Sequence, residues 1–171
     1  MTVFTPSGTI LTLSADAPAT LDEEGYDAIT YTEIGEVGDL GDIPTPVYDA
    51  VAWATVTERG EYKSKGGYSL GSQTVTVAID PDDAGQALVD AATLDDELYT
   101  VKIEHPDLGI IFGRALVNGG PRLYGDTGTI STRQITFEYV DILVTEGIPA
   151  GSLTIGGNPI TINGKYITVG V

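Results

Sequence analysis

Cysteine is missing from this 171-residue chain, and histidine occurs once, at His105. Without cysteine the chain has no disulfide framework, no thiolate metal site and no cysteine nucleophile. One histidine excludes a two-histidine zinc site, and no G-x-S-x-G nucleophile motif accompanies it. We therefore expect a protein that is not an enzyme and that carries no metal or other cofactor.

Long apolar runs are also missing. No stretch approaches the roughly 18 consecutive apolar residues of a membrane span. The opening MTVFTPSGTILTL has no basic region, and Pro6 and Gly8 interrupt its short apolar run, so it does not resemble a signal peptide. We expect a soluble protein without membrane association.

Basic residues are scarce. The chain has 8 Lys and Arg against 25 Asp and Glu, for a net charge of -17, and residues 1–58 hold 11 acids and no base. Nucleic-acid affinity that is independent of sequence comes from Lys and Arg displacing counterions from phosphates, so a surface with this balance repels DNA. Specific nucleic-acid binding is therefore not expected. Colloidal repulsion that keeps the protein in solution also accounts for the acidity.

What the chain does have is glycine, 22 residues, between short β-prone runs. In QTVTVAI, Val75 and Val77 alternate with polar residues, as in a half-buried strand. The same alternation occurs in YTVKIEH around Val101 and in QITFEYV around Ile135 and Phe137. Further strands are predicted at 9–13, 30–34, 51–57 and 109–117. Such spacing is typical of a mainly β fold, either a β-sandwich or a barrel-like sheet.

One flanking α-helix is predicted at about residues 81–93, in PDDAGQALVDAAT. Asp80 is the expected N-cap, and Pro81 suits the first helical position. The small residues of this segment recur at helical spacing and predict its packed face, which comprises Ala84, Ala87, Leu88, Ala91 and Ala92. A second, weaker helical turn is predicted in LDEEGYDAI, where three acids precede the turn.

A linker-like GIPAG follows Glu146, which divides the chain into a main domain at 1–146 and a short C-terminal β extension at 147–171. In the extension, GGN and NG lie between short β-prone runs, and Asn-Gly is a strong hairpin signal. We expect a three-stranded meander. Because about 20 residues bury little surface, it should dock on the core or on a neighbouring subunit.

Three phrases occur in an order that resembles the tail tube proteins, or major tail proteins, of long-tailed phages with non-contractile tails. They are TLDEEGYDAITYTEIGEVGDLGDI, then ERGEYKSKGGYSLGSQTVTVAIDPDDAGQALVDAA, then YTVKIEHPDLGIIFGRALV. The resemblance covers about residues 15–146. It implies a virion structural protein without a catalytic site, made in the host bacterial cytoplasm and located in the virion tail.

The resemblance also implies partners. Copies would form stacked hexameric rings around a channel, next to tape measure, tail terminator and tail tip proteins. DNA would pass through that channel without specific binding, and carboxylates on the wall would keep it from sticking.

A plausible contact between subunits pairs two charged segments. Residues 36–50 are rich in Gly, Pro and Asp and are expected to form a loop, while 59–69 holds three of the eight basic residues. We expect the acidic loop of one subunit to lie against the basic segment of the next. The candidate interface residues are Glu36, Asp39, Asp42, Asp49, Arg59, Lys63 and Lys65.

Three alternatives remain open at this point. One is another ring or tube component of a related tail or secretion apparatus, which the fold alone would not distinguish. Another is an extracellular β-sandwich adhesin or carbohydrate-binding module, which would have an aromatic groove. The last is an acidic hydrolase with two carboxylates of raised pKa in one cleft.

Overall fold

The computed structural model describes residues 3, 5–54, 56 and 60–146, and four short strands between residues 154 and 166. For 143–146 and for those four strands only the backbone is described. Within these parts of the chain, no helix is long and apolar enough to cross a membrane.

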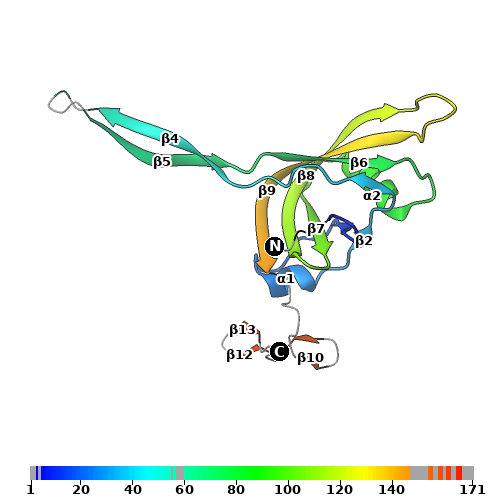
Figure 1. Ribbon diagram of the computed structural model, residues 1–171, viewed down its shortest axis with the longest axis horizontal. Helices are drawn as coiled ribbons and strands as arrows, with labels where there is room; N and C mark the ends of the chain where they lie inside the picture. Colours follow the sequence, from blue (N-terminus) through cyan, green and yellow to red (C-terminus); the bar gives the residue numbers. More distant parts are fainter. Residues whose placement is uncertain are drawn as a thin grey trace.

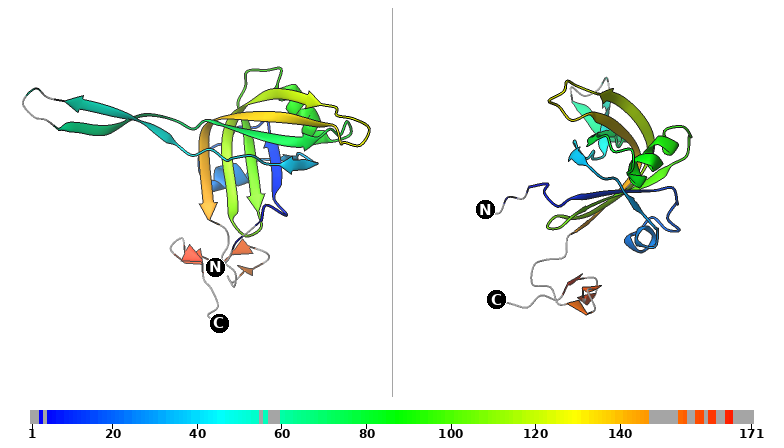
Figure 2. Two further views of the ribbon diagram at one scale, coloured as in Figure 1. Left: turned by 45° about the horizontal axis from the view of Figure 1, so that its top comes forward. Right: turned by 90° about the vertical axis from the view of Figure 1, so that its right-hand side faces the viewer.

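Seven antiparallel strands form one strongly curled sheet, in the order β2-β1-β7-β8-β9-β6-β3 (Figure 1). The curling produces a half-barrel, which confirms the expected mainly β, barrel-like class (Figure 2). The strands are β1 (Ile10–Ser14), β2 (Thr32–Glu33), β3 (Val37–Asp39), β6 (Ser72–Ala78), β7 (Tyr99–His105), β8 (Gly109–Leu123) and β9 (Thr132–Glu146).

The hydrophobic core lies on the strand faces that the alternation of apolar and polar residues predicted. Val75, Val77, Val101, Ile135 and Phe137 are all buried and belong to one hydrophobic cluster. Their side chains leave the sheet on the same face because successive residues of a strand point to opposite sides. Burial of this face is the main source of the domain's stability.

Helix α2 (Ala84–Ala92) covers part of this core, but the predicted cap was wrong and the predicted packed face was wrong in part. Asp83, not Asp80, is the N-cap, because its Oδ1 accepts a hydrogen bond of 2.6 Å from the Gln86 amide. The helix thus begins later than predicted, and its buried face is shifted by about one position. The buried residues are Gly85, Gln86, Val89 and Ala92, and Leu88 also packs against the core, as predicted for Leu88 and Ala92, whereas Ala84, Ala87 and Ala91 are exposed.

The short helix α1 (Glu23–Asp27) confirms the second predicted turn, with Asp22 as its N-cap. Its Tyr26 is fully buried and stacks on Phe112, with ring centroids 5.1 Å apart. Phe112 points away from the main core because its neighbour Ile111 packs against that core. A second, smaller apolar contact therefore holds α1 on the other face of the sheet.

Two further strands lie outside this sheet. β4 (Val47–Ala54) and β5 (Glu61–Ser69) pair only with each other and form a hairpin, here called the arm, that projects far from the half-barrel (Figure 1). The expected loop at 36–50 is therefore wrong in part. It contains β3 and the first half of β4, because both find antiparallel partners farther along the chain.

The C-terminal segment contains two separate two-stranded ladders instead of the expected three-stranded meander. β10 (Thr154–Ile155) pairs with β11 (Asn158–Pro159), and β12 (Thr161–Ile162) pairs with β13 (Lys165–Tyr166). Residues 156–157 and 163–164, on which the predicted hairpin turns fall, lie outside the described residues. The docking of this segment stays a prediction.

Candidate functional site

The arm has two chemically different faces. Residues directly opposite each other in an antiparallel pair share a face. Trp53 faces Tyr62, and Val51, two residues earlier, lies on the same side of the ribbon. These three residues define the aromatic face of the arm.

The other face of the arm is charged. Ala52 is opposite Lys63, and Ala50 is opposite Lys65. The Lys63 ammonium lies 3.9 Å from a carboxylate oxygen of Glu61, and that of Lys65 lies 4.3 Å from the ring centroid of Tyr48. The two described strands of the arm thus hold two of the eight basic residues of a very acidic chain.

The aromatic face is open to solvent. Trp53 is 71% exposed, Tyr62 61% and Val51 56%. All eight residues of β4 are exposed, and no third layer of the described structure covers the ribbon. A two-stranded ribbon is marginally stable at best in water, and contiguous exposed apolar surface is typical of an interaction site.

The predicted interface residues fall on this arm and on the segment that leads to it. Asp49, Lys63 and Lys65 lie on the arm, and Arg59 lies outside the described residues. Glu36, Asp39 and Asp42 are exposed on the preceding segment. Asp39 accepts a hydrogen bond of 2.9 Å from Gly41, and the Glu36 carbonyl accepts one of 2.9 Å from Ala78. The proposed pairing of these charges between subunits stays a prediction.

Sequence reasoning missed the aromatic face. The signal was present in VYDAVAWA, where Val51 and Trp53 alternate with alanines. That alternation predicts a strand with one apolar face, which would ordinarily be assigned to the core. Only the pairing of β4 with β5 alone shows that this face is exposed.

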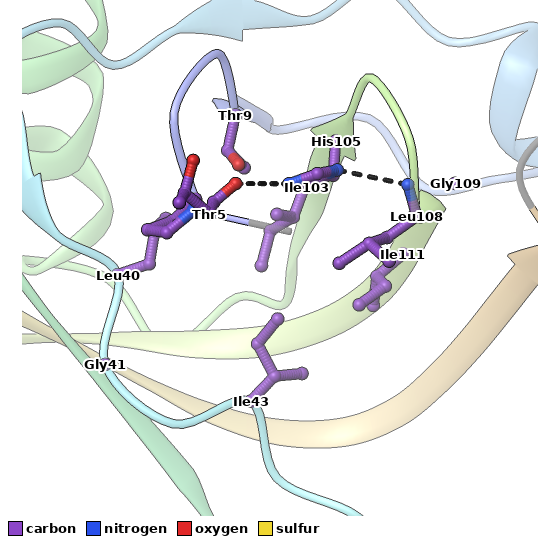
Figure 3. Close-up of a pocket in the computed structure, with 11 residues that line it drawn as sticks. Thr5, Thr9, Leu40, Gly41, Ile43, Ile103, His105, Leu108, Gly109 and Ile111 are labelled. Atoms are coloured by element: carbon purple, nitrogen blue, oxygen red, sulfur yellow. Dashed lines mark hydrogen bonds between the residues drawn. The ribbon is translucent and has the colours of Figure 1, made fainter. Parts of the chain in front are cut away.

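An apolar pocket of about 320 Å³ opens near the base of the arm (Figure 3). Its walls come from three distant segments: 5–9 near the N-terminus, 40–43 before the arm, and the turn between β7 and β8. The apolar side chains that line it include Leu40, Ile43, Ile103, Leu108 and Ile111.

His105 holds the wall of this pocket together. Its Nδ1 accepts hydrogen bonds of 3.0 Å from the amides of Asp107 and Leu108. The other nitrogen, Nε2, therefore carries the proton and donates to the Thr5 carbonyl at 2.8 Å (Figure 3). His105 thus ties the N-terminal segment to the turn between β7 and β8.

The chain resembles known proteins in its fold but not in its sequence. Neither a protein-family model nor a curated protein sequence matches the chain. Solved structures do match. A chain in the tail of the empty gene transfer agent particle, which has C6 symmetry, is 12% identical with a TM-score of 0.58, and the match covers 84% of this chain and 99% of that chain.

The SPP1 tail tube is 14% identical with a TM-score of 0.53, over 90% of this chain and 95% of that chain. The chain has the tail tube fold. A chain of the six-fold symmetrised anti-feeding prophage baseplate is also similar, at 9% identity and a TM-score of 0.57, over 85% of this chain and 98% of that chain.

On this tail tube fold, the altered pKa values have structural causes. Burial raises the pKa of Tyr139 and of Tyr26, whose hydroxyl also donates to Asp141. Burial likewise raises the pKa of Tyr31 to about 12. Hydrogen bonds from Thr20 and from the Gly25 amide lower the pKa of the helix cap Asp22. None of these residues lines the apolar pocket.

Metal ligands are not grouped in the described part of the tail tube fold. No cluster of three or more His, Asp or Glu residues there could hold a metal ion. What this part of the chain offers instead is two apolar surfaces, the arm and the pocket.

Proposed function

We propose that this chain is the structural subunit of a phage tail tube. Copies would form six-membered rings that stack around a channel for phage DNA. The observation that carries the proposal is the arm: its aromatic face is exposed on a fold shared with tail proteins. A second copy is the simplest partner that buries this face.

The arm suits a closed ring. It projects from one side of the half-barrel (Figure 2), and we propose that it contacts a different surface of the next copy. Such a heterologous contact forms a ring when the rotation between copies closes, and a second set of contacts stacks the rings. The six-fold symmetry of the gene transfer agent tail favours hexameric rings.

The subunit would act without catalysis or specific DNA binding. Its net charge of -17 disfavours phosphate contacts, which suits a channel that must release DNA. The protein would be made in the host bacterial cytoplasm and end in the virion tail, in contact with tape measure, tail terminator and tail tip proteins. Residues 147–171 would form an extension that docks on the core or on the neighbouring subunit.

A second candidate is a ring of a related injection apparatus. The likeness to a chain of the anti-feeding prophage baseplate favours it. Assembly length distinguishes the two: a tube subunit polymerises without a fixed limit, whereas a baseplate or terminator protein stops at one or a few rings.

Negative-stain microscopy of the concentrated full chain tests the proposal. We expect hollow tubes with six-fold rings. The double variant Val51→Ser, Trp53→Ser should stay folded by circular dichroism and lose the tubes, because it removes the apolar character of the arm. Leu94→Ser, which changes an exposed apolar residue outside the arm, serves as the matched control. A wild-type protein that remains a compact monomer at every concentration contradicts the proposal.

A further inference from the structure

Two apolar surfaces of the described chain are open to solvent: the Trp53 side of the arm and the apolar pocket. Trp53 lies at the far end of β4, with its indole largely in solvent. The pocket is lined by Leu40 and Ile43, which lie in the segment that connects β3 to the base of the arm. We propose that Trp53 of one subunit inserts into the apolar pocket of the next subunit. This inference rests on the proposed function and names the receiving surface.

The chain cannot make this contact within itself. Strands rise by about 3.3 Å per residue, so the eight residues of β4 carry Trp53 roughly 20 Å away from the base of the arm. The arm extends away from the sheet (Figure 1). The pocket is lined by residues of β7 and β8, which belong to the sheet. A second copy is therefore required.

The size and chemistry of the pocket fit an indole. Its volume of about 320 Å³ is twice the roughly 150 Å³ in which an apolar protein cavity takes up benzene. Ile43, Ile103 and Ile111 supply aliphatic walls, and Leu108, 58% exposed, stands at the mouth. Tryptophan in a desolvated pocket is a common hot spot of protein interfaces.

Charge around the two surfaces favours the same pairing. Exposed Asp39, Asp42 and Asp107 lie in or beside the segments that form the pocket and the depression next to it. The strands of the arm carry Lys63 and Lys65 against Asp49 and Glu61, so they are neutral in a chain whose net charge is -17. A neutral arm therefore meets less repulsion from the acidic rim than the acidic remainder of a second subunit would.

The hairpin end between β8 and β9 is the competing receiver. Leu123, Tyr124 and Ile130 are exposed there. The β8–β9 hairpin projects from the half-barrel at this end (Figure 1), whereas the apolar pocket has walls from three segments of the chain. The pocket is therefore the better partner for Trp53.

Two measurements test the contact, and both use the full chain. Trp53 is the only tryptophan, so its fluorescence reports on the arm alone. We expect its emission maximum to shift to shorter wavelength when tubes form, because the indole moves from water into an apolar pocket. Emission that stays at the position of an exposed indole in assembled tubes overturns the inference.

Cross-linking identifies the receiving surface, since the natural chain contains no cysteine. One protein carries Val51→Cys, which keeps Trp53, and a second carries Leu108→Cys. A short thiol-reactive cross-linker should give covalent dimers in the assembled mixture and none in either protein alone. The matched control replaces Leu108→Cys with Tyr124→Cys, which is similarly exposed at 65% and lies at the competing receiver.

The outcomes separate this inference from the proposed function. Tubes whose dimers form only with Tyr124→Cys overturn the pocket and leave the tube proposal standing. Tubes that give no covalent dimers in either mixture also overturn the pocket and leave the tube proposal standing. Absence of any ring or tube in the wild-type protein overturns both.

Discussion

Arg133 is an almost completely buried cation, 5% exposed, on strand β9. One guanidinium nitrogen donates to Asp90 at 2.6 Å, and another donates to the Gln86 carbonyl at 3.0 Å. Both acceptors belong to α2. This side chain therefore helps to fasten the helix to the sheet, beside Arg122, which also contacts Asp90.

Removal of the Arg133 charge tests how much this residue contributes to stability. We expect Arg133→Met to lower the free energy of unfolding by about 1.5–3 kcal/mol, because it removes two charged hydrogen bonds from a buried site. Urea denaturation followed by circular dichroism measures the change. Arg122→Met is the matched control: Arg122 also contacts Asp90, but at 3.4 Å and half exposed, so its loss should cost less than about 1 kcal/mol. Equal losses for the two variants would contradict this account.

Among the contacts between secondary-structure elements, the contact between helix α2 and strand β2 is very close. A Cβ atom on Gly85 would collide with the backbone carbonyl of Glu33. Asp83, just before the helix, accepts a hydrogen bond of 3.1 Å from Gly35 in addition to the one from Gln86. Glycine at this position is thus required by the packing of the helix, and the cap is also a tertiary contact.

Gly85→Ala separates helix propensity from packing. Alanine would favour the helix by about 1 kcal/mol if the site were open. We expect a net loss of about 1–3 kcal/mol, because the added methyl group overpacks the contact with β2. The same urea titration measures it. Ala87→Ser, on the exposed side of the helix, should change stability by no more than about 0.5 kcal/mol. A stabilised Gly85→Ala variant would show that the helix can move away from the strand.

At the scale of the whole molecule, assembly must overcome the repulsion between subunits that each carry a net charge of -17. Six such subunits in a ring repel one another over the Debye length. Dissolved salt screens this repulsion, but it does not screen the apolar contacts of the arm. Salt therefore changes the balance between free and assembled subunits.

We expect the assembled fraction to rise when the salt concentration increases from about 0.01 M to about 0.15 M, as the Debye length falls from about 30 Å to about 8 Å. Sedimentation of tubes from a fixed protein concentration measures this fraction. Circular dichroism at both salt concentrations controls for the fold of the free subunit. Assemblies that dissolve as salt increases would show instead that the contacts of Lys63 and Lys65 with acids dominate.

The sequence by itself determined the mainly β class, the core-facing positions of β6, β7 and β9, and the existence of both helices. These are local properties: alternation around Val75, Val101 and Phe137 records which face of a strand is buried. The choice between Asp80 and Asp83 as helix cap was not local. Both aspartates are suitable, and the amide of Gly35, nearly fifty residues away, selects Asp83.

Only the tertiary structure decided which apolar residues face solvent. Trp53 and Val77 both occur in alternating runs, but β6 pairs with β9 inside the sheet, whereas β4 pairs only with β5. The pocket likewise joins the segments 5–9, 40–43 and 103–111, which no local pattern brings together. Strand pairing between distant segments determines both surfaces, and a local sequence pattern does not encode it.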